Sequence, residues 1–279
     1  MAAGFSGLFC TPLAAIFFAL EVLVAGKLEY HALIPATVAS ISAAFTSRTL
    51  GLRKFHINIL ETLNYHPSTY NAVLLLKLAT MGLVFGIVGS LFALIFRSLR
   101  LKFAFRFSSP VKKVLIMGSV VAVLMMIFHQ GRYSGTGSNL VALCFDGITD
   151  DIYAYDWILK MALTILTLSS GFIGGEVAPL FSIGSCLGYV LGPVFGFDPM
   201  FGAALGFASV FCSGSNTLLA AILVGVESFG YNMLPFFSVV CFVSFIFNFN
   251  NSIFTAQRVA FTHPVRHQRL KQRIAPKGN

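Results

Sequence analysis

Gly174-Gly175-Glu176-Val177-Ala178-Pro179 stands between two apolar segments, where a membrane chain is expected to have either a helix or a surface loop. Its two glycines, its acid and a proline at the expected first turn predict a helix that begins inside the lipid bilayer. The N-terminus of such a helix presents free backbone N–H groups and the positive end of the helix dipole. All six residues are therefore predicted to line an anion-binding site.

The composition is that of a membrane protein. Of the 279 residues, 57% are apolar and only 10% are charged, and the mean hydropathy is +0.83. Soluble domains carry about 25% charged residues. The apolar residues form long runs rather than short alternating strands, which indicates helices and not a β-barrel. We therefore expect an all-α polytopic membrane protein embedded in a lipid bilayer.

Two basic clusters predict the orientation, and no acid interrupts either of them. The first follows one long apolar segment and the second lies in the C-terminal tail: Arg97, Arg100, Lys102, Arg106, Lys112 and Lys113, then Arg266, Arg269, Lys271, Arg273 and Lys277. The positive-inside rule places both on the cytoplasmic side, so we expect a multi-pass protein of the inner membrane with a cytoplasmic C-terminus. The tail could also be read as binding nucleic acid, but its position beside a membrane helix already explains it.

No pattern points to an enzyme, a metal or a cofactor. The five cysteines are never spaced as CxxC, and four of them lie within apolar segments, which is typical of small buried side chains. The six histidines include no HExxH motif. Since no nucleophile or carboxylate pair stands out either, the class of enzymes is not favoured, and the only ion expected is a transported one.

Several predicted helices are too short to span a membrane, for which about 20 residues are needed. Their ends must lie in protein or face water, because lipid cannot bond free backbone groups. Many such broken helices indicate a transporter or channel with a site near the membrane midplane. We expect about twelve segments: 1–11, 13–23, 30–49, 70–103, 110–129, 138–146, 156–172, 177–195, 199–213, 216–227, 231–247 and 252–260.

An internal repeat indicates a duplicated fold. Residues 4–11 read GFSGLFCT and residues 206–213 read GFASVFCS. Residues 13–21 read LAAIFFALE, and after a four-residue insertion residues 219–227 read LAAILVGVE. Each copy is thus a helix, a break and a short helix that ends in an acid.

At this point the chain resembles the CLC family of chloride channels and proton-coupled anion exchangers. Residues 3–21 resemble the helix pair after the family's gating loop, and residues 174–179 resemble its GG-x-x-AP motif. Residues 206–227 resemble its next helix pair, and residues 252–256 the start of its final helix. The resemblance implies a CLC-type fold with an inverted repeat, covered here from family helix G to helix R. It predicts a transmembrane domain over residues 1–260 and a basic cytoplasmic tail over residues 261–279.

The resemblance implies transport of a halide, by a channel or by an anion/proton antiporter. The anion would be held by the backbone amides of Glu176 and Val177. A family tyrosine that helps to hold it corresponds to Phe254, which lacks the hydroxyl but could offer a ring edge. The GGEVAP form is closer to the bacterial branch that includes fluoride exporters. The family also implies a homodimer through residues 13–49 and 216–247.

Three acids within the apolar segments have two readings each. Glu176 could act in transport, as membrane carboxylates often do, or stabilise the helix dipole while it points away from the pathway. Glu21 and Glu227 are expected to cap or pair in the dimer contact region, or to belong to a proton path. The family's second glutamate after Glu21 is replaced by Val22, which weakens the proton-path reading.

The family's first helices, with a second half of the anion site, would precede residue 1. Two hypotheses follow. The complete protein transports a halide, or the chain is a truncated, non-transporting fragment that keeps the dimerisation helices and half of the site.

Overall fold

The computed structural model describes residues 1–52, 55–63, 71–106, 109–146 and 152–260. The predicted basic tail, residues 261–279, lies outside the described residues. The described part is nearly all helical, and its elements in chain order are α1 (Ala2–Phe9), α2 (Pro12–Glu21), β1 (Val24–Ala25), η1 (Tyr30–Ala32), α3 (Leu33–Thr49), α4 (Ile59–Thr62), α5 (Ala72–Arg106), α6 (Pro110–Ile127), η2 (His129–Gly131), α7 (Ser138–Phe145), α8 (Asp156–Ser169), α9 (Val177–Val194), α10 (Pro199–Ser215), α11 (Leu219–Phe229), η3 (Tyr231–Met233), α12 (Leu234–Ile246) and β2 (Arg258–Val259).

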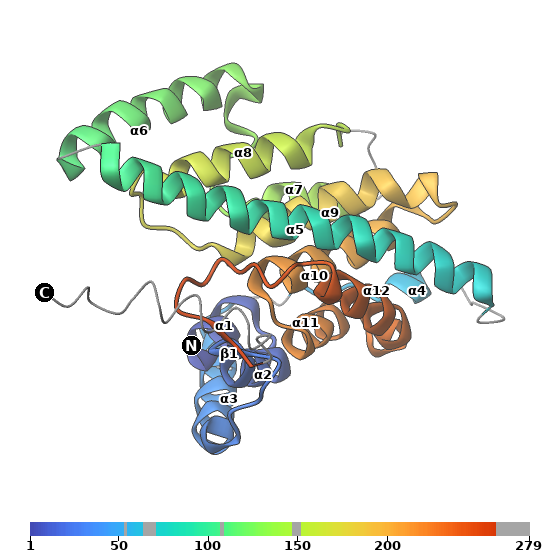
Figure 1. Cartoon of the computed structure of the whole chain (residues 1–279). Helices are drawn as coiled ribbons and strands as arrows, with labels where there is room; N and C mark the ends of the chain where they lie inside the picture. The colour runs from blue at the N-terminus through green and yellow to red at the C-terminus, as the bar shows by residue number, and fades with distance from the viewer. Residues whose placement is uncertain (53–54, 64–70, 107–108, 147–151, 261–279) are drawn as a thin grey trace, which may run out of the picture.

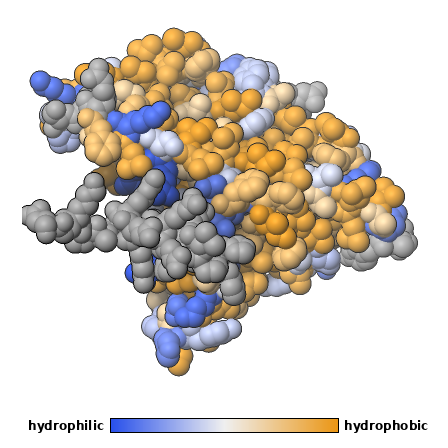
Figure 2. All heavy atoms as spheres, viewed as in Figure 1, coloured by the Kyte–Doolittle hydropathy of each residue, from blue (hydrophilic) through white to orange (hydrophobic). Residues whose placement is uncertain are grey.

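The helices form an extended bundle around one long helix. α5 crosses the whole molecule, with α6 and α8 on one side of it and α10 to α12 on the other, while α1 to α3 form a group beside α11 (Figure 1). Among the described residues, three helical stretches are long and apolar enough to cross a membrane: Ala72–Phe105, Pro110–Ile127 and Val177–Val194. Most of the face shown in Figure 2 is apolar. The all-α polytopic membrane fold predicted from composition is confirmed.

Glycines on α5 allow its neighbours to pack closely. A Cβ atom at Gly82 would lie 2.8 Å from the carbonyl oxygen of Val240, and one at Gly86 would lie 2.8 Å from that of Ser244. The spacing of Gly82, Gly86 and Gly89 therefore marks the face of α5 that packs against α12 and α10, as expected for small residues in membrane helices.

The predicted final helix at 252–260 is wrong. The segment consists of turns followed by β2, which pairs with β1 in parallel, Val24 opposite Arg258. Its backbone is bonded elsewhere: Ile253 N donates to Gly214 O and Arg258 N donates to Leu23 O. The side-chain amide of Gln257 also donates to Ser215 O. Since the backbone N–H groups of Ile253 and Arg258 bond to the ends of α10 and α2, they are not available for the i→i−4 hydrogen bonds of a helix.

The internal repeat is present in the structure. α1–α2 and α10–α11 are each a helix, a left-handed break and a second helix, with breaks at Cys10 (φ 53°) and Asn216 (φ 55°). The four extra residues of the second copy lengthen its first helix, because α10 continues to Ser215 whereas α1 stops at Phe9. Both copies bring their second helices, α2 and α11, into contact with each other.

Candidate anion site

The sequence motif at 174–179 forms the open N-terminus of α9, as predicted. Glu176 is the N-cap residue, and its own side chain makes no capping hydrogen bond. Gly174 and Gly175 are exposed, and a Cβ atom at Gly175 would meet no atom within 4 Å. The N–H groups of the first turn have no partner within the helix, so they are available to an anion in front of it.

The side chain of Glu176 is directed to α5. Its Oε1 lies 3.7 Å from Nη1 of Arg100, and Arg100 in turn lies over the ring of Phe96. This pairing leaves the first turn of α9 without its own carboxylate. It supports the interpretation that Glu176 stabilises the helix start while its charge points away from the site.

Carboxylates from another helix fill the starts of α2 and α11. Glu227, at the end of α11, accepts hydrogen bonds from Leu13 N (3.3 Å) and Ala14 N (2.9 Å) at the start of α2. Glu21, at the end of α2, accepts from Leu218 N (2.6 Å) at the start of α11, and from Ala220 N (3.2 Å).

These reciprocal caps show that α2 and α11 run antiparallel. Both carboxylates are 4% exposed and each is committed to two backbone amides. Such bonding supports a structural role for Glu21 and Glu227 over a proton path. At the starts of α2 and α11 a protein carboxylate from another helix thus supplies the negative charge, whereas the carboxylate at the start of α9, Glu176, is directed to Arg100.

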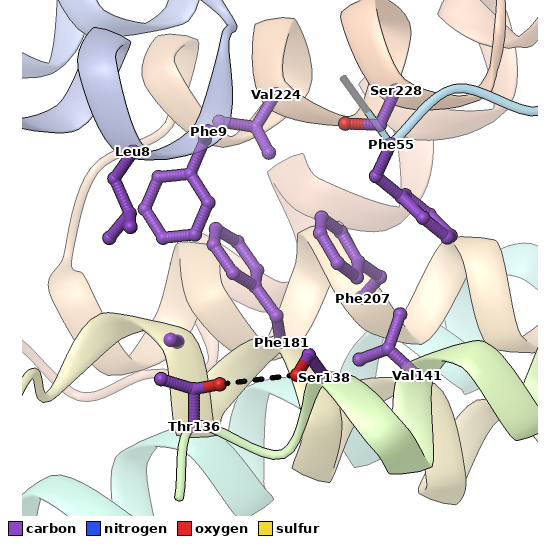
Figure 3. A pocket seen from close by; sticks show the side chains of 11 residues that line it. Leu8, Phe9, Phe55, Thr136, Ser138, Val141, Phe181, Phe207, Val224 and Ser228 are labelled. Carbon is purple, nitrogen blue, oxygen red and sulfur yellow. Dashed lines mark hydrogen bonds between the residues drawn. The ribbon is translucent and has the colours of Figure 1, made fainter. Parts of the chain in front are cut away.

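A phenylalanine-lined cavity lies beside the first turns of α9 and α7. Its volume is about 230 Å³, and Ala178 and Phe181 of α9, Phe207 of α10 and Phe9 of α1 form much of its wall. Figure 3 shows the rings of Phe9, Phe181 and Phe207 around it, with the hydroxyls of Thr136 and Ser138 at its rim, 3.4 Å apart. Aromatic edges carry partial positive charge, so this wall can face an anion.

Phe254 lies away from that cavity wall. Its ring packs edge-on against Phe18 of α2, with centroids 5.9 Å apart, and its backbone N–H donates to the Ser252 hydroxyl. It reaches the cavity only through neighbouring rings, since Phe18 contacts Phe211, and Phe211 contacts Phe181. Its predicted contact with the anion stays a proposal.

A buried polar cluster beside α9 was missed by the sequence reasoning. Asp156, the first residue of α8, is fully buried and accepts hydrogen bonds from Arg132 Nη2 (2.8 Å) and the Tyr133 hydroxyl (2.6 Å). Burial and this bond to Asp156 raise the pKa of the Tyr133 hydroxyl, so the tyrosine stays neutral and donates. One turn further along α8 lies Lys160. The sequence does carry a signal for this cluster, because ionisable residues inside an apolar segment often have a functional role.

The described residues contain no group of three histidine, cysteine or acidic side chains placed to hold a metal ion.

Comparison with known proteins identifies the family. A family model described as "Voltage gated chloride channel" matches residues 1–248. The chain belongs to the voltage gated chloride channel family. The resemblance drawn from residues 174–179 and 206–227 is thereby confirmed.

Individual relatives within the family agree. The chain is 32% identical to the "Chloride/fluoride channel protein" of Pseudomonas syringae pv. tomato, over 98% of this chain and 60% of the relative. It is 28% identical to the "H(+)/Cl(-) exchange transporter ClcA" of Yersinia pestis, over 81% of this chain and 48% of the relative.

Two solved structures share the fold. A "CLC-type fluoride/proton antiporter" superposes with a TM-score of 0.86 at 46% identity, over 93% of this chain and 64% of that one. A slow cyanobacterial Cl-/H+ antiporter superposes with a TM-score of 0.70 at 21% identity, over 88% of this chain and 59% of that one, which shows the fold alone. The chain thus spans about half to two thirds of the length of these relatives. These relatives are described as channels, exchangers and antiporters.

Proposed function

We propose that this protein takes part in the movement of a halide, fluoride or chloride, across a membrane, and that the anion passes the start of α9. The observation that carries the proposal is the uncapped first turn of α9 in a fold that fills the starts of α2 and α11 with carboxylates. A mobile anion in front of Val177 and Ala178 takes the place that Glu227 and Glu21 hold elsewhere. The family membership supports the same reading.

The choice of halide rests on the relatives. The GGEVAP motif and 46% identity to a fluoride/proton antiporter support fluoride. The relative described as a chloride/fluoride channel is the reason to measure chloride as well. None of these relatives is described as a non-transporting protein, so nothing in them favours the alternative of a non-transporting fragment.

Halide efflux from liposomes tests the proposal. The purified chain is reconstituted, and ion-selective electrodes follow fluoride and chloride separately, with a pH electrode to separate a channel from a proton-coupled exchanger. Gly175→Leu is the informative variant, because its Cβ enters open space and the added side chain stands at the helix start. Gly4→Leu on α1 is the matched control, since a Cβ there also meets nothing within 4 Å.

The proposal predicts that efflux through Gly175→Leu falls to the leak of empty liposomes while Gly4→Leu behaves as the unmutated protein. Equal efflux through Gly175→Leu and through the unmutated protein would contradict the assignment of the anion site to the start of α9. Absence of efflux of either halide through the unmutated chain would contradict the transport function itself.

We also propose the arrangement implied by the family: a homodimer through residues 13–49 and 216–247, in an inner membrane, with the C-terminus on the cytoplasmic side. Apolar side chains exposed on α3 and α12 support the interface: Ile34, Val38, Ile41, Phe45, Phe242 and Ile246. Light scattering of the detergent-solubilised protein measures the mass. A monomer at all concentrations tested, with no change on Val38→Glu, would contradict the dimer.

A further inference from the structure

A second cavity lies beside the motif at 174–179 and contains a buried cation. Its volume is about 270 Å³, and its wall includes Gly174, Gly175, Thr136, Thr164 and Lys160. A water molecule occupies about 30 Å³ of liquid, so the cavity has room for a halide with part of its hydration shell. The cavity is separate from the phenylalanine-lined one, but Thr136 forms part of both walls.

Lys160 carries a charge that no acid of the described residues neutralises. Its side chain is 1% exposed, and its ammonium donates to Tyr133 O (2.8 Å) and Gly135 O (2.9 Å), which leaves one N–H of the three. The nearby acid, Asp156, is paired with Arg132 instead. Two cations, the buried Lys160 and the partly buried Arg132, therefore lie near one acid. Since buried charge is costly unless paired, this excess positive charge favours an anion in the cavity.

The surrounding backbone holds the ammonium in place. Gly137 has a left-handed φ of 85°, and a Cβ atom there would lie 2.8 Å from Cε of Lys160. A glycine at this position lets the loop before α7 approach the lysine, so that the carbonyls of residues 133 and 135 can bond it. The lysine is thus fixed at a wall that also carries the two glycines of the α9 start.

We propose that this cavity is a second halide site, in which the Lys160 ammonium holds an anion on the opposite side of Thr136 from the phenylalanine-lined cavity. Two adjacent cavities, one cationic and one aromatic, then flank the start of α9. The inference rests on the proposed function for the identity of the ion. It adds a site whose ligand is a side-chain cation rather than the first-turn amides of α9.

Anomalous diffraction from crystals of the unmutated protein soaked in bromide locates the sites without any variant. The proposal predicts a bromide peak beside Nζ of Lys160, distinct from any peak in front of Val177. Bromide in front of Val177 with none beside Lys160 would overturn the second site and leave the proposed function intact.

Equilibrium dialysis with radioactive chloride counts the sites in solution. Lys160→Met keeps the length of the side chain and removes its charge. The bound chloride is expected to fall by one ion per chain in Lys160→Met and to stay unchanged in Lys160→Arg. Lys77→Met is the control, because Lys77 lies over the ring of Phe197, away from this cavity.

The same variants separate this inference from the transport proposal. Lys160→Met is expected to raise the halide concentration for half-maximal efflux about tenfold, the effect of one charged hydrogen bond, with maximal efflux kept. An unchanged chloride count in folded Lys160→Met would overturn the second site. If Gly175→Leu leaves efflux unchanged while Lys160→Met still loses one chloride, the transport assignment fails and the second site stands.

Discussion

Replacing Glu227 by alanine removes the carboxylate that caps α2. The two amides that it accepts from, the part-buried Leu13 N and the buried Ala14 N, then lose this partner. A hydrogen bond to a charged group contributes about 1.5–3 kcal/mol, and a favourable charge at a helix terminus contributes up to about 2 kcal/mol. Because the bond to Leu13 N is long, at 3.3 Å, we expect Glu227→Ala to lower the free energy of unfolding by about 2–4 kcal/mol in total.

Unfolding in mixed micelles with increasing dodecyl sulfate, followed by circular dichroism, measures this change. Glu29→Ala is the matched control, because Glu29 forms an ion pair with Lys27 whose side chain is 61% exposed; we expect it to cost less than about 1 kcal/mol. The mirror change, Glu21→Ala, is expected to act like Glu227→Ala. Since both caps hold one helix pair, the double variant should cost less than the sum of the two. Equal midpoints for Glu227→Ala and Glu29→Ala would refute the reciprocal caps.

Two further changes are measured in the same way. Asp156→Ala removes the acid that accepts from both Arg132 and the buried Tyr133 hydroxyl and should cost about 3–5 kcal/mol; a loss below about 1 kcal/mol would show that the cluster is not held by this acid. Gly184→Val should cost at least about 1–3 kcal/mol, because any Cβ at Gly184 meets the backbone of Gly206 and forces α9 and α10 apart. A midpoint equal to that of the unmutated protein would contradict that helix contact.

The sequence predicted the fold well where a local pattern determined it. The repeat at residues 4–21 and 206–227 predicted two helix pairs, and the motif at 174–179 predicted the start of α9, because glycine, proline and apolar spacing act within a few residues. The prediction of a final helix at 252–260 failed because that segment is determined by distant contacts and not by a local pattern. Its backbone groups bond to α10 and to β1, partners that are far away in sequence.

The candidate site was predictable only in part. The open first turn follows from the motif, but the phenylalanine-lined cavity is formed by rings from α1, α9 and α10 that only the tertiary packing brings together. Lys160 and Asp156, in contrast, lie one turn apart at the start of an apolar helix and were visible in the sequence. Their significance depends on Arg132, which lies 24 residues before Asp156 and neutralises it in place of the lysine.

In the proposed function, the backbone amides at the start of α9 hold the transported anion. Replacing Val177 by its α-hydroxy acid exchanges one amide N–H for an ester oxygen and keeps the side chain. The same exchange at Val111, in the exposed first turn of α6, is the control. In the liposome assay, the account predicts that the ester at 177 raises the halide concentration for half-maximal efflux about tenfold while the ester at 111 has no effect. Unchanged efflux with the ester at 177 would contradict it.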